Sequence, residues 1–132
     1  MHKILLMSLA IMLSGCAVGI QQGKEYPSET FAVPIGYQEA YRRADAQPRK
    51  CFPGLTTAGD LFTDNHTGIV RSFAPGVGGE SMNIRVQELT PGQTKVTVTV
   101  WGVGYFDQAQ LDAVRESIES GNPICREPKD RR

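Results

Sequence analysis

Alternating apolar and polar residues in the second half of the chain predict a β-hairpin. From Lys95 to Trp101 valines alternate with threonines, and from Met82 to Gln87 apolar residues alternate with polar ones. This period of two places the valines on one face of a sheet and the threonines on the other. Between the two runs, Thr90–Gln93 reads Thr-Pro-Gly-Gln, and proline followed by glycine is typical of a tight turn. Weaker patterns predict two earlier strands, at Gly68–Phe73 and Thr57–Phe62.

Two amphipathic helices are predicted, one before and one after the strands. Over Tyr37–Gln47, tyrosines and alanines recur at the spacing i, i+3, i+4 and i+7, which is one face of a helix. Pro48 is expected to end this helix, because the residue before a proline is pushed out of the helical region. The second helix is expected over Asp107–Ser120, with Asp107 as the N-cap and Gln110 three residues later, as in a capping box.

The order helix, strands, helix predicts an α+β domain over about residues 35–126. A three- to four-stranded antiparallel sheet has one apolar face, and the N-terminal and C-terminal helices can cover it. A chain of 132 residues has room for one domain of ordinary size and not for two.

The N-terminus has the layout of a secretory signal peptide. Lys3 precedes ten mostly apolar residues, Ile4–Leu13, and small residues follow them. Ten helical residues rise about 15 Å, half of a hydrocarbon core of roughly 30 Å, so this run is too short to span a bilayer. Residues 1–15 are therefore expected to be removed.

The tetrapeptide Leu13-Ser14-Gly15-Cys16 directly follows the apolar run and closely resembles the lipobox of bacterial lipoproteins. The resemblance implies that Cys16 becomes the first residue after cleavage and carries acyl chains such as palmitate; more than one chain makes anchoring stable. In the bacterial sorting pattern, an aspartate after the cysteine retains a lipoprotein in the inner membrane, and Ala17 takes that position here. The resemblance therefore points to the outer membrane, with the domain facing the periplasm.

The remainder of the chain is similar to the small uncharacterised envelope lipoproteins of Gram-negative bacteria. Its helix–strands–helix order is also loosely similar to the helix-grip domains of outer-membrane assembly lipoproteins, an analogy of fold that implies no activity. Residues 16–34, which are rich in Gly, Gln, Pro and Ser, are expected to form a flexible tether after the lipidated cysteine. Residues 127–132 are expected to form a charged tail.

Lipidation of Cys16 would leave two of the three cysteines, Cys51 and Cys125. In the oxidising periplasm two remaining thiols are expected to form a disulfide. A reactive cysteine or a pair of metal ligands is the alternative, but neither cysteine belongs to a Cys-x-x-Cys motif or has a histidine near it in sequence.

Charge and composition narrow the function classes. The chain has 14 Lys and Arg against 14 Asp and Glu, so its formal net charge is zero and it has no global attraction to nucleic acid. Its two histidines disfavour multi-histidine metal sites, and no cofactor is expected.

His66 is the one histidine left after removal of the signal peptide, and it is the candidate for catalysis. A general base needs a nucleophile and an orienting carboxylate. Asp60 and Asp64 lie nearby in sequence, but the chain has no Gly-x-Ser-x-Gly motif. The spacing of these acidic residues also differs from that of a calcium loop. An exposed turn is therefore the favoured interpretation of His66, and no metal site or catalytic residue is assigned.

Two groups of residues are candidates for a partner or ligand surface. Arg42 and Arg43 belong to a local basic patch, and Trp101 and Tyr105 lie between the last strand and the last helix. The leading hypothesis is a non-enzymatic interaction or structural module that contacts an envelope protein. The second is a module that binds a small ligand or an envelope polymer on the threonine face near Trp101, and the third is a hydrolase using His66. The sequence leaves the oligomeric state open.

Overall fold

A computed structural model of the chain describes residues 18–74 and 78–128. The expected signal peptide, the lipobox with Cys16, and residues 129–132 of the expected tail lie outside these ranges. The elements follow in the order β1 (Ser28–Val33), α1 (Tyr37–Cys51), β2 (Thr56–Phe62), β3 (Thr67–Phe73), β4 (Glu80–Thr90), β5 (Gln93–Val100) and α2 (Gln108–Ser120).

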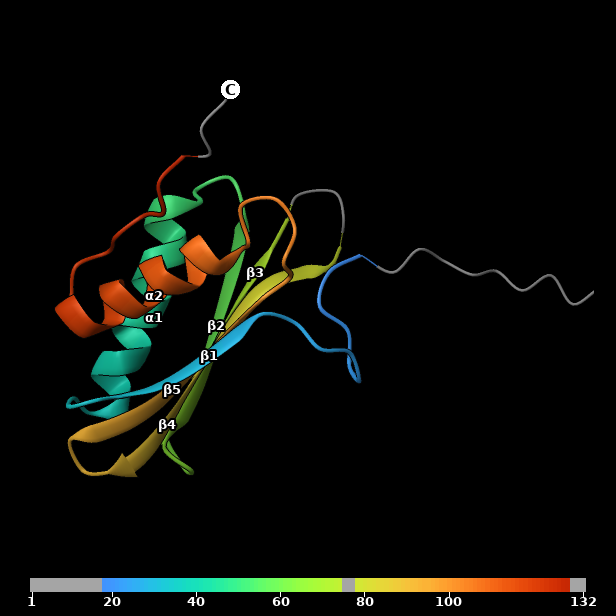
Figure 1. The fold of residues 1–132 in the computed structure, drawn as a ribbon. Coiled ribbons are helices and arrows are strands. Elements are labelled where there is room, and N and C mark those ends of the chain that lie inside the picture. Colours follow the sequence, from blue (N-terminus) through green and yellow to red (C-terminus); the bar gives the residue numbers. More distant parts are fainter. Residues whose placement is uncertain (1–17, 75–77, 129–132) are drawn as a thin grey trace, which may run out of the picture.

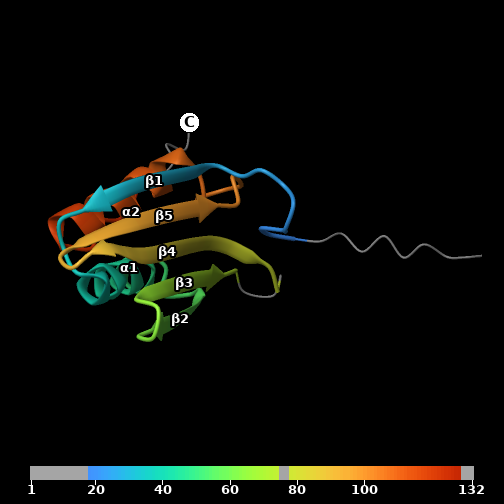
Figure 2. The same cartoon turned by 90° about the horizontal axis from the view of Figure 1, so that it is seen from below.

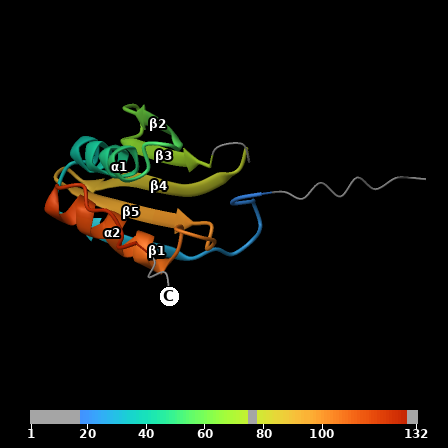
Figure 3. The same cartoon turned by 90° about the horizontal axis from the view of Figure 1, so that it is seen from above.

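The fold is α+β, with two layers. Five strands form one sheet in the order β1-β5-β4-β3-β2, and every neighbouring pair is antiparallel. Both helices pack on the same face of this sheet (Figure 1). Figure 3 shows the molecule with the helices in front, and Figure 2 shows the opposite face, where the strands lie in front of the helices. One face of the sheet is therefore covered, and the other is open over the described part of the chain.

The predicted hairpin is confirmed as β4 and β5. Val98 pairs with Ile84, and Val96 pairs with Val86, so the apolar positions of the two strands share one face. The chain turns between the strands through Gly92, whose φ of 86° lies in the left-handed region that glycine tolerates. The two weaker strands are also present, as β2 and β3.

The sheet has five strands rather than the three to four predicted, because residues 28–33 of the expected tether form β1. This strand pairs with β5 along its whole length, from Ser28↔Thr99 to Val33↔Thr94. It buries Phe31 and Val33, which are 7% and 1% exposed. The alternation of apolar and polar residues in this stretch is short and ends at Pro34, so the sequence pattern for a strand is weak. Pairing with β5 decides that these residues form a strand. The order is consequently strand, helix, four strands, helix, and α1 does not precede all the strands.

The prediction that Pro48 ends the first helix is wrong. The helix α1 continues to Cys51, and Pro48 is buried within its last turn. A proline removes one backbone donor, yet its carbonyl oxygen still accepts the bond that closes the helix, from Phe52 N at 2.8 Å. Ala40 and Ala44, from the predicted apolar face, are fully buried.

The second helix begins and ends close to the predicted residues. Asp107 is the N-cap, and its side chain accepts a hydrogen bond from Gln110 N at 3.2 Å. The Gln110 side chain points into the protein, where its amide nitrogen donates to Gln47 Oε1 at 3.1 Å. Gly121 ends the helix with a φ of 80°.

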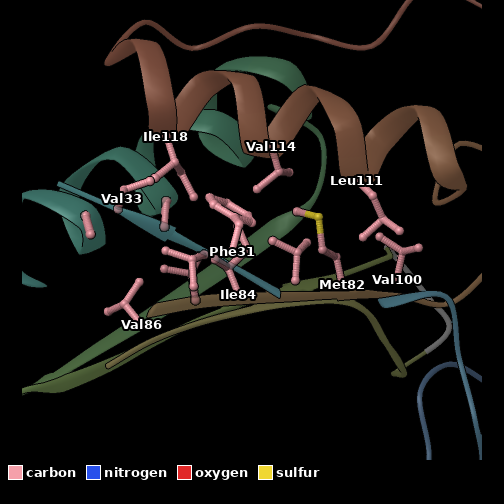
Figure 4. Close-up of a cluster of buried hydrophobic side chains, with 14 of the residues drawn as sticks. Phe31, Val33, Met82, Ile84, Val86, Val100, Leu111, Val114 and Ile118 are labelled. Atoms are coloured by element: carbon pink, nitrogen blue, oxygen red, sulfur yellow. The ribbon is translucent and has the colours of Figure 1, made fainter. Parts of the chain in front are cut away.

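The core lies between the covered face and the two helices. Figure 4 shows Leu111, Val114 and Ile118 of α2 directed towards side chains from the strands. The valines of β5 are fully buried, which explains the clean alternation in the sequence. The cluster comprises Phe31, Val33, Ala40, Ala44, Val70, Met82, Ile84, Val86, Val96, Val98, Val100, Phe106, Leu111, Val114 and Ile118.

Two glycines in neighbouring strands make room for Tyr41 of α1. A Cβ atom at Gly68 would lie 2.7 Å from Tyr41 Cδ2, and one at Gly59 would overlap the tyrosine hydroxyl. The ring therefore rests directly on the backbone of β2 and β3. Burial, and then the carboxylates of Asp45 and Asp60, raise the pKa of Tyr41.

The predicted pairing of Cys51 with Cys125 is present. The two Cα atoms lie 5.3 Å apart, and the bond joins residues separated by 74 positions. It connects the end of α1 with the segment that follows α2. The same segment is held by Gln47, whose side-chain amide donates to Ile124 O at 3.1 Å.

Candidate binding surface

The open face of the sheet is a surface that neither helix covers over the described residues. Because side chains alternate along a strand, the threonines of β5 lie on this face, opposite the buried valines. Thr97 and Thr99 stand beside hydroxyl groups of β1: Thr30 Oγ1 lies 3.1 Å from Thr97 Oγ1, and Ser28 Oγ lies 3.2 Å from Thr99 Oγ1. The side of the open face nearest β1 is therefore a row of paired hydroxyls.

The other side of the open face carries charge and a cavity. The register places Asp60, Ile69 and Arg85 next to one another across β2, β3 and β4. A shallow cavity of about 430 Å³ opens here. Ile69 is only 5% exposed, whereas Phe62 at the end of β2 is 48% exposed. The cavity is lined by Asp60, Phe62, Thr67, Gly68, Ile69, Arg71, Arg85, Val86 and Gln87.

Glu80 and Arg71 form an ion pair at one edge of this region, with 3.4 Å between Arg71 Nε and Glu80 Oε1. Burial raises the pKa of Glu80, and the neighbouring guanidinium groups of Arg71 and Arg85 only partly oppose that effect. The pair removes part of the positive charge of Arg71, so Arg85 is the more available cation on the open face.

Trp101 and Tyr105 lie away from this cavity. Strand β5 ends at Val100, and Trp101 N donates to Ser81 O at 2.9 Å, while the partly buried indole packs against the core. Tyr105 is 47% exposed, and its ring lies under the guanidinium of Arg126, with 5.2 Å between Arg126 Cζ and the ring centroid. Tyr105 lines a second cavity, of about 320 Å³, beside the disulfide.

The basic residues Arg42 and Arg43 do not join the aromatic pair. Arg43 Nη1 donates to Ile118 O at 2.8 Å, in the last turn of α2, whereas Tyr105 precedes the first turn. A helix of this length is about 20 Å long, so the two candidate groups lie at opposite ends of α2. Hydrogen bonds from Arg42 and Arg43 lower the pKa of the Glu39 carboxyl to about 2, and both guanidinium groups are paired with this carboxylate. Arg43 thus joins α1 to α2, whereas Arg42 is exposed and is paired within α1.

His66 lies in the turn between β2 and β3, as predicted. Its φ of 53° is the one positive value among the described residues other than glycine. The ring is stacked on Tyr37, with 4.9 Å between centroids, and its Nδ1 atom contacts the Glu88 carboxylate. The His66 side chain is 52% exposed and lies outside the cavity lining.

Over the described ranges, the structure contains no group of three or more His, Cys, Asp or Glu side chains that could hold a metal ion. Within the same ranges, no helix is both long enough and apolar enough to cross a bilayer. No family model matches the chain, and no curated protein matches it.

The sequence did not single out the cavity residues, chiefly Phe62, Arg71 and Arg85. Arg71 and Arg85 are polar positions that alternate with the apolar ones assigned to the core, and Phe62 is an apolar residue at the end of a weak strand. Alternation shows which residues share a face, but it does not show that β2, β3 and β4 lie side by side in that order.

Proposed function

We propose that the chain is a lipid-anchored envelope protein whose domain is a non-enzymatic interaction module, with the open face of the sheet as its contact surface. One observation carries this proposal. Both helices cover the same face, and the other face combines a charged cavity, a row of hydroxyls and an exposed phenylalanine. The lipobox supports an anchor at Cys16, and Ala17 favours the outer membrane, facing the periplasm.

The partner we propose is a protein that presents carboxylates beside an apolar side chain. Arg85 is exposed, and the register places Lys95 on the same face, so this surface offers two cations. Phe62 and the cavity above Ile69 offer an apolar contact next to them. A protein surface supplies carboxylates and apolar side chains close together. Its negative charge would also favour encounters in the correct orientation with the cations of the open face.

An envelope polymer or small ligand is the second candidate, and the paired hydroxyls of β1 and β5 favour it. Thr30, Thr97, Ser28 and Thr99 can exchange hydrogen bonds with hydroxyl groups of a sugar. The cavity lies beside β3 instead of near Trp101, so such a ligand would extend across the open face from these hydroxyls to the cavity.

Photo-crosslinking in cells tests the contact surface. A photoreactive amino acid at Gln87, which lines the cavity, is expected to give a specific adduct with a protein, and the same group at the exposed Glu116 of α2 is expected to give none. Arg85→Glu should then abolish the adduct at position 87, because it reverses the charge that faces the partner. An adduct whose added mass is removed by a glycan-cleaving enzyme would favour the polymer instead. Adducts from position 116 alone would contradict both.

The anchor is tested separately by fractionation. The native protein is expected in the outer-membrane fraction, and Cys16→Ser should move it into a soluble or unprocessed form. An unchanged distribution of the Cys16→Ser variant would contradict lipidation.

A further inference from the structure

The described chain is fixed to the sheet from its first residues onwards. Ile20 N donates to Glu80 O, at the start of β4, with 2.7 Å between the atoms. Gly19 has a φ of 93°, and a Cβ atom there would lie 2.6 Å from Glu80 O. A Cβ atom at Gly79 would overlap the carbonyl oxygen of Val18. Two stretches of backbone therefore touch directly, which only glycine permits.

The residues between this contact and β1 form a closed loop. Gln21 N donates to the Tyr26 hydroxyl at 2.8 Å, and that hydroxyl lies 3.4 Å from Gly19 O, to which it donates. Val100 N donates to Pro27 O at 3.0 Å. The segment 18–27 is thus held at both ends, although it was expected to be part of a flexible tether.

This attachment leaves little chain between the expected lipid and the domain. Only residue 17 separates Cys16 from Val18, and two fully extended residues span at most about 7 Å. The headgroup layer on each side of a bilayer is of similar thickness, about 5–8 Å. If Cys16 is lipidated, residues 18–20 must lie at the membrane surface.

The loop that joins β5 to α2 lies at this same end of the sheet. Figures 1 and 3 show the blue N-terminal segment beside the end of the sheet from which the orange loop leaves. Trp101 N is bonded to Ser81 O, one residue from the partner of Ile20, and Gly102 lies against the ring of Pro27. Val103 and Tyr105 in this loop are 52% and 47% exposed.

We propose that this end of the domain rests on the membrane, with Val103 and Tyr105 in the headgroup layer of the phospholipid bilayer. We call it the anchor end and define it as residues 18–20, 79–81 and 101–106. Tyrosine and tryptophan prefer the membrane interface, because an aromatic body and a polar tip fit the two sides of that boundary. The short attachment argues for a membrane over a protein partner at this loop. The inference rests on the proposed lipidation of Cys16.

The geometry also sets the orientation of the open face. The turns that follow β2 and β4 lie at the opposite end of the sheet, so they point away from the bilayer (Figure 2). The plane of the open face is then roughly perpendicular to the membrane, and this face remains accessible to a partner in the periplasm.

Position-specific fluorescence tests the inference. The processed full-length lipoprotein is placed in vesicles of phosphatidylethanolamine and phosphatidylglycerol, with a polarity-sensitive dye on Val103→Cys. The matched control is Leu89→Cys at the opposite end, which is 49% exposed, close to the 52% of Val103. We expect a blue shift at position 103 and several-fold stronger quenching by spin-labelled lipids there than at position 89. Equal quenching at both positions, or quenching at neither, would overturn the inference.

Trp101 gives a second measurement without a dye, because it is the only tryptophan in the chain. Val103→Ser combined with Tyr105→Ser should reduce quenching of Trp101 by brominated lipids at least twofold, and Leu89→Ser should leave it unchanged. Both changes affect exposed side chains, so folding is preserved. Unchanged quenching in the double variant would count against contact through this loop.

Flotation of the vesicles separates the two proposals. If the protein floats but shows no quenching at position 103, the proposed lipid anchor is retained and the contact of the anchor end with the membrane is refuted. Native protein that does not float refutes lipidation, and the anchor end with it.

Discussion

Val98 and Thr97 are neighbours in β5, yet they belong to different environments. Val98 is fully buried under the helices, and Thr97 lies on the open face beside the Thr30 hydroxyl. The same contrast extends across the sheet: the covered face consists of aliphatic side chains, and the open face consists of hydroxyls and charges around one cavity. The covered face carries the buried apolar cluster, and the open face carries the surface that we propose as the contact site.

The largest expected effect concerns the disulfide, which joins the end of α1 to the segment that follows α2 and so links the two covering helices. The double variant Cys51→Ala with Cys125→Ala should lose about 4 kcal/mol of unfolding free energy, because closing a loop of this length restricts the unfolded chain. The melting temperature should fall by roughly 15–30 °C. Calorimetry of the oxidised protein and of the variant measures the difference. A fall in melting temperature of only a few degrees would show that other contacts hold the two helices on the sheet.

Adjacent substitutions in β5 compare the two faces directly. Val98→Ala should cost about 2 kcal/mol, because it removes buried methyl groups and leaves a small void. Thr97→Ala should cost about 0.5 kcal/mol, since it removes one exposed hydroxyl pair. Chemical denaturation of both variants gives the values. Equal losses would mean that the open face is also covered in solution.

The smallest expected effect concerns the one carboxylate of the open face whose pKa is raised. Burial raises the pKa of Glu80 above 4.5, so the folded state disfavours its charged form. This cost is absent below pH 4.5, grows as the pH rises through the folded pKa, and is complete above it. Glu80→Gln should therefore stabilise the protein at neutral pH by less than about 1 kcal/mol, because the ion pair with Arg71 is lost at the same time.

Denaturation at two pH values checks this last prediction. The advantage of Glu80→Gln should vanish below pH 4.5, where the native side chain is also neutral. A variant that is less stable than the native protein at neutral pH would show that the ion pair with Arg71 outweighs the cost of burial.

Several elements could be predicted because their signals are local. The hairpin followed from a period of two joined by Pro91-Gly92, and α2 followed from its N-cap and Gly121. The pairing of Cys51 with Cys125 followed from counting thiols and from the expectation of an oxidising compartment. The strand β1 and the last turn of α1 were missed, because pairing with β5 and burial of Pro48 override weak local preferences.

The candidate surface was less predictable than the fold. Trp101, Tyr105, Arg42 and Arg43 were singled out by residue type, but the structure does not bring them together. Trp101 packs against the core, Tyr105 lies under Arg126, Arg43 contacts the end of α2, and Arg42 is paired within α1. The cavity residues are polar and apolar positions from three different strands, and none of them carries a local signal of a binding site.

The sequence by itself determined which residues share a face, since that depends only on the geometry of a strand or a helix. It also contains the motif around Cys16 on which the proposed anchor depends. The tertiary structure alone decided that Ile69 lies between Asp60 and Arg85, and that the segment after Cys16 lies against the start of β4. Those contacts join residues far apart in the chain, and only the packing of the whole sheet brings them together.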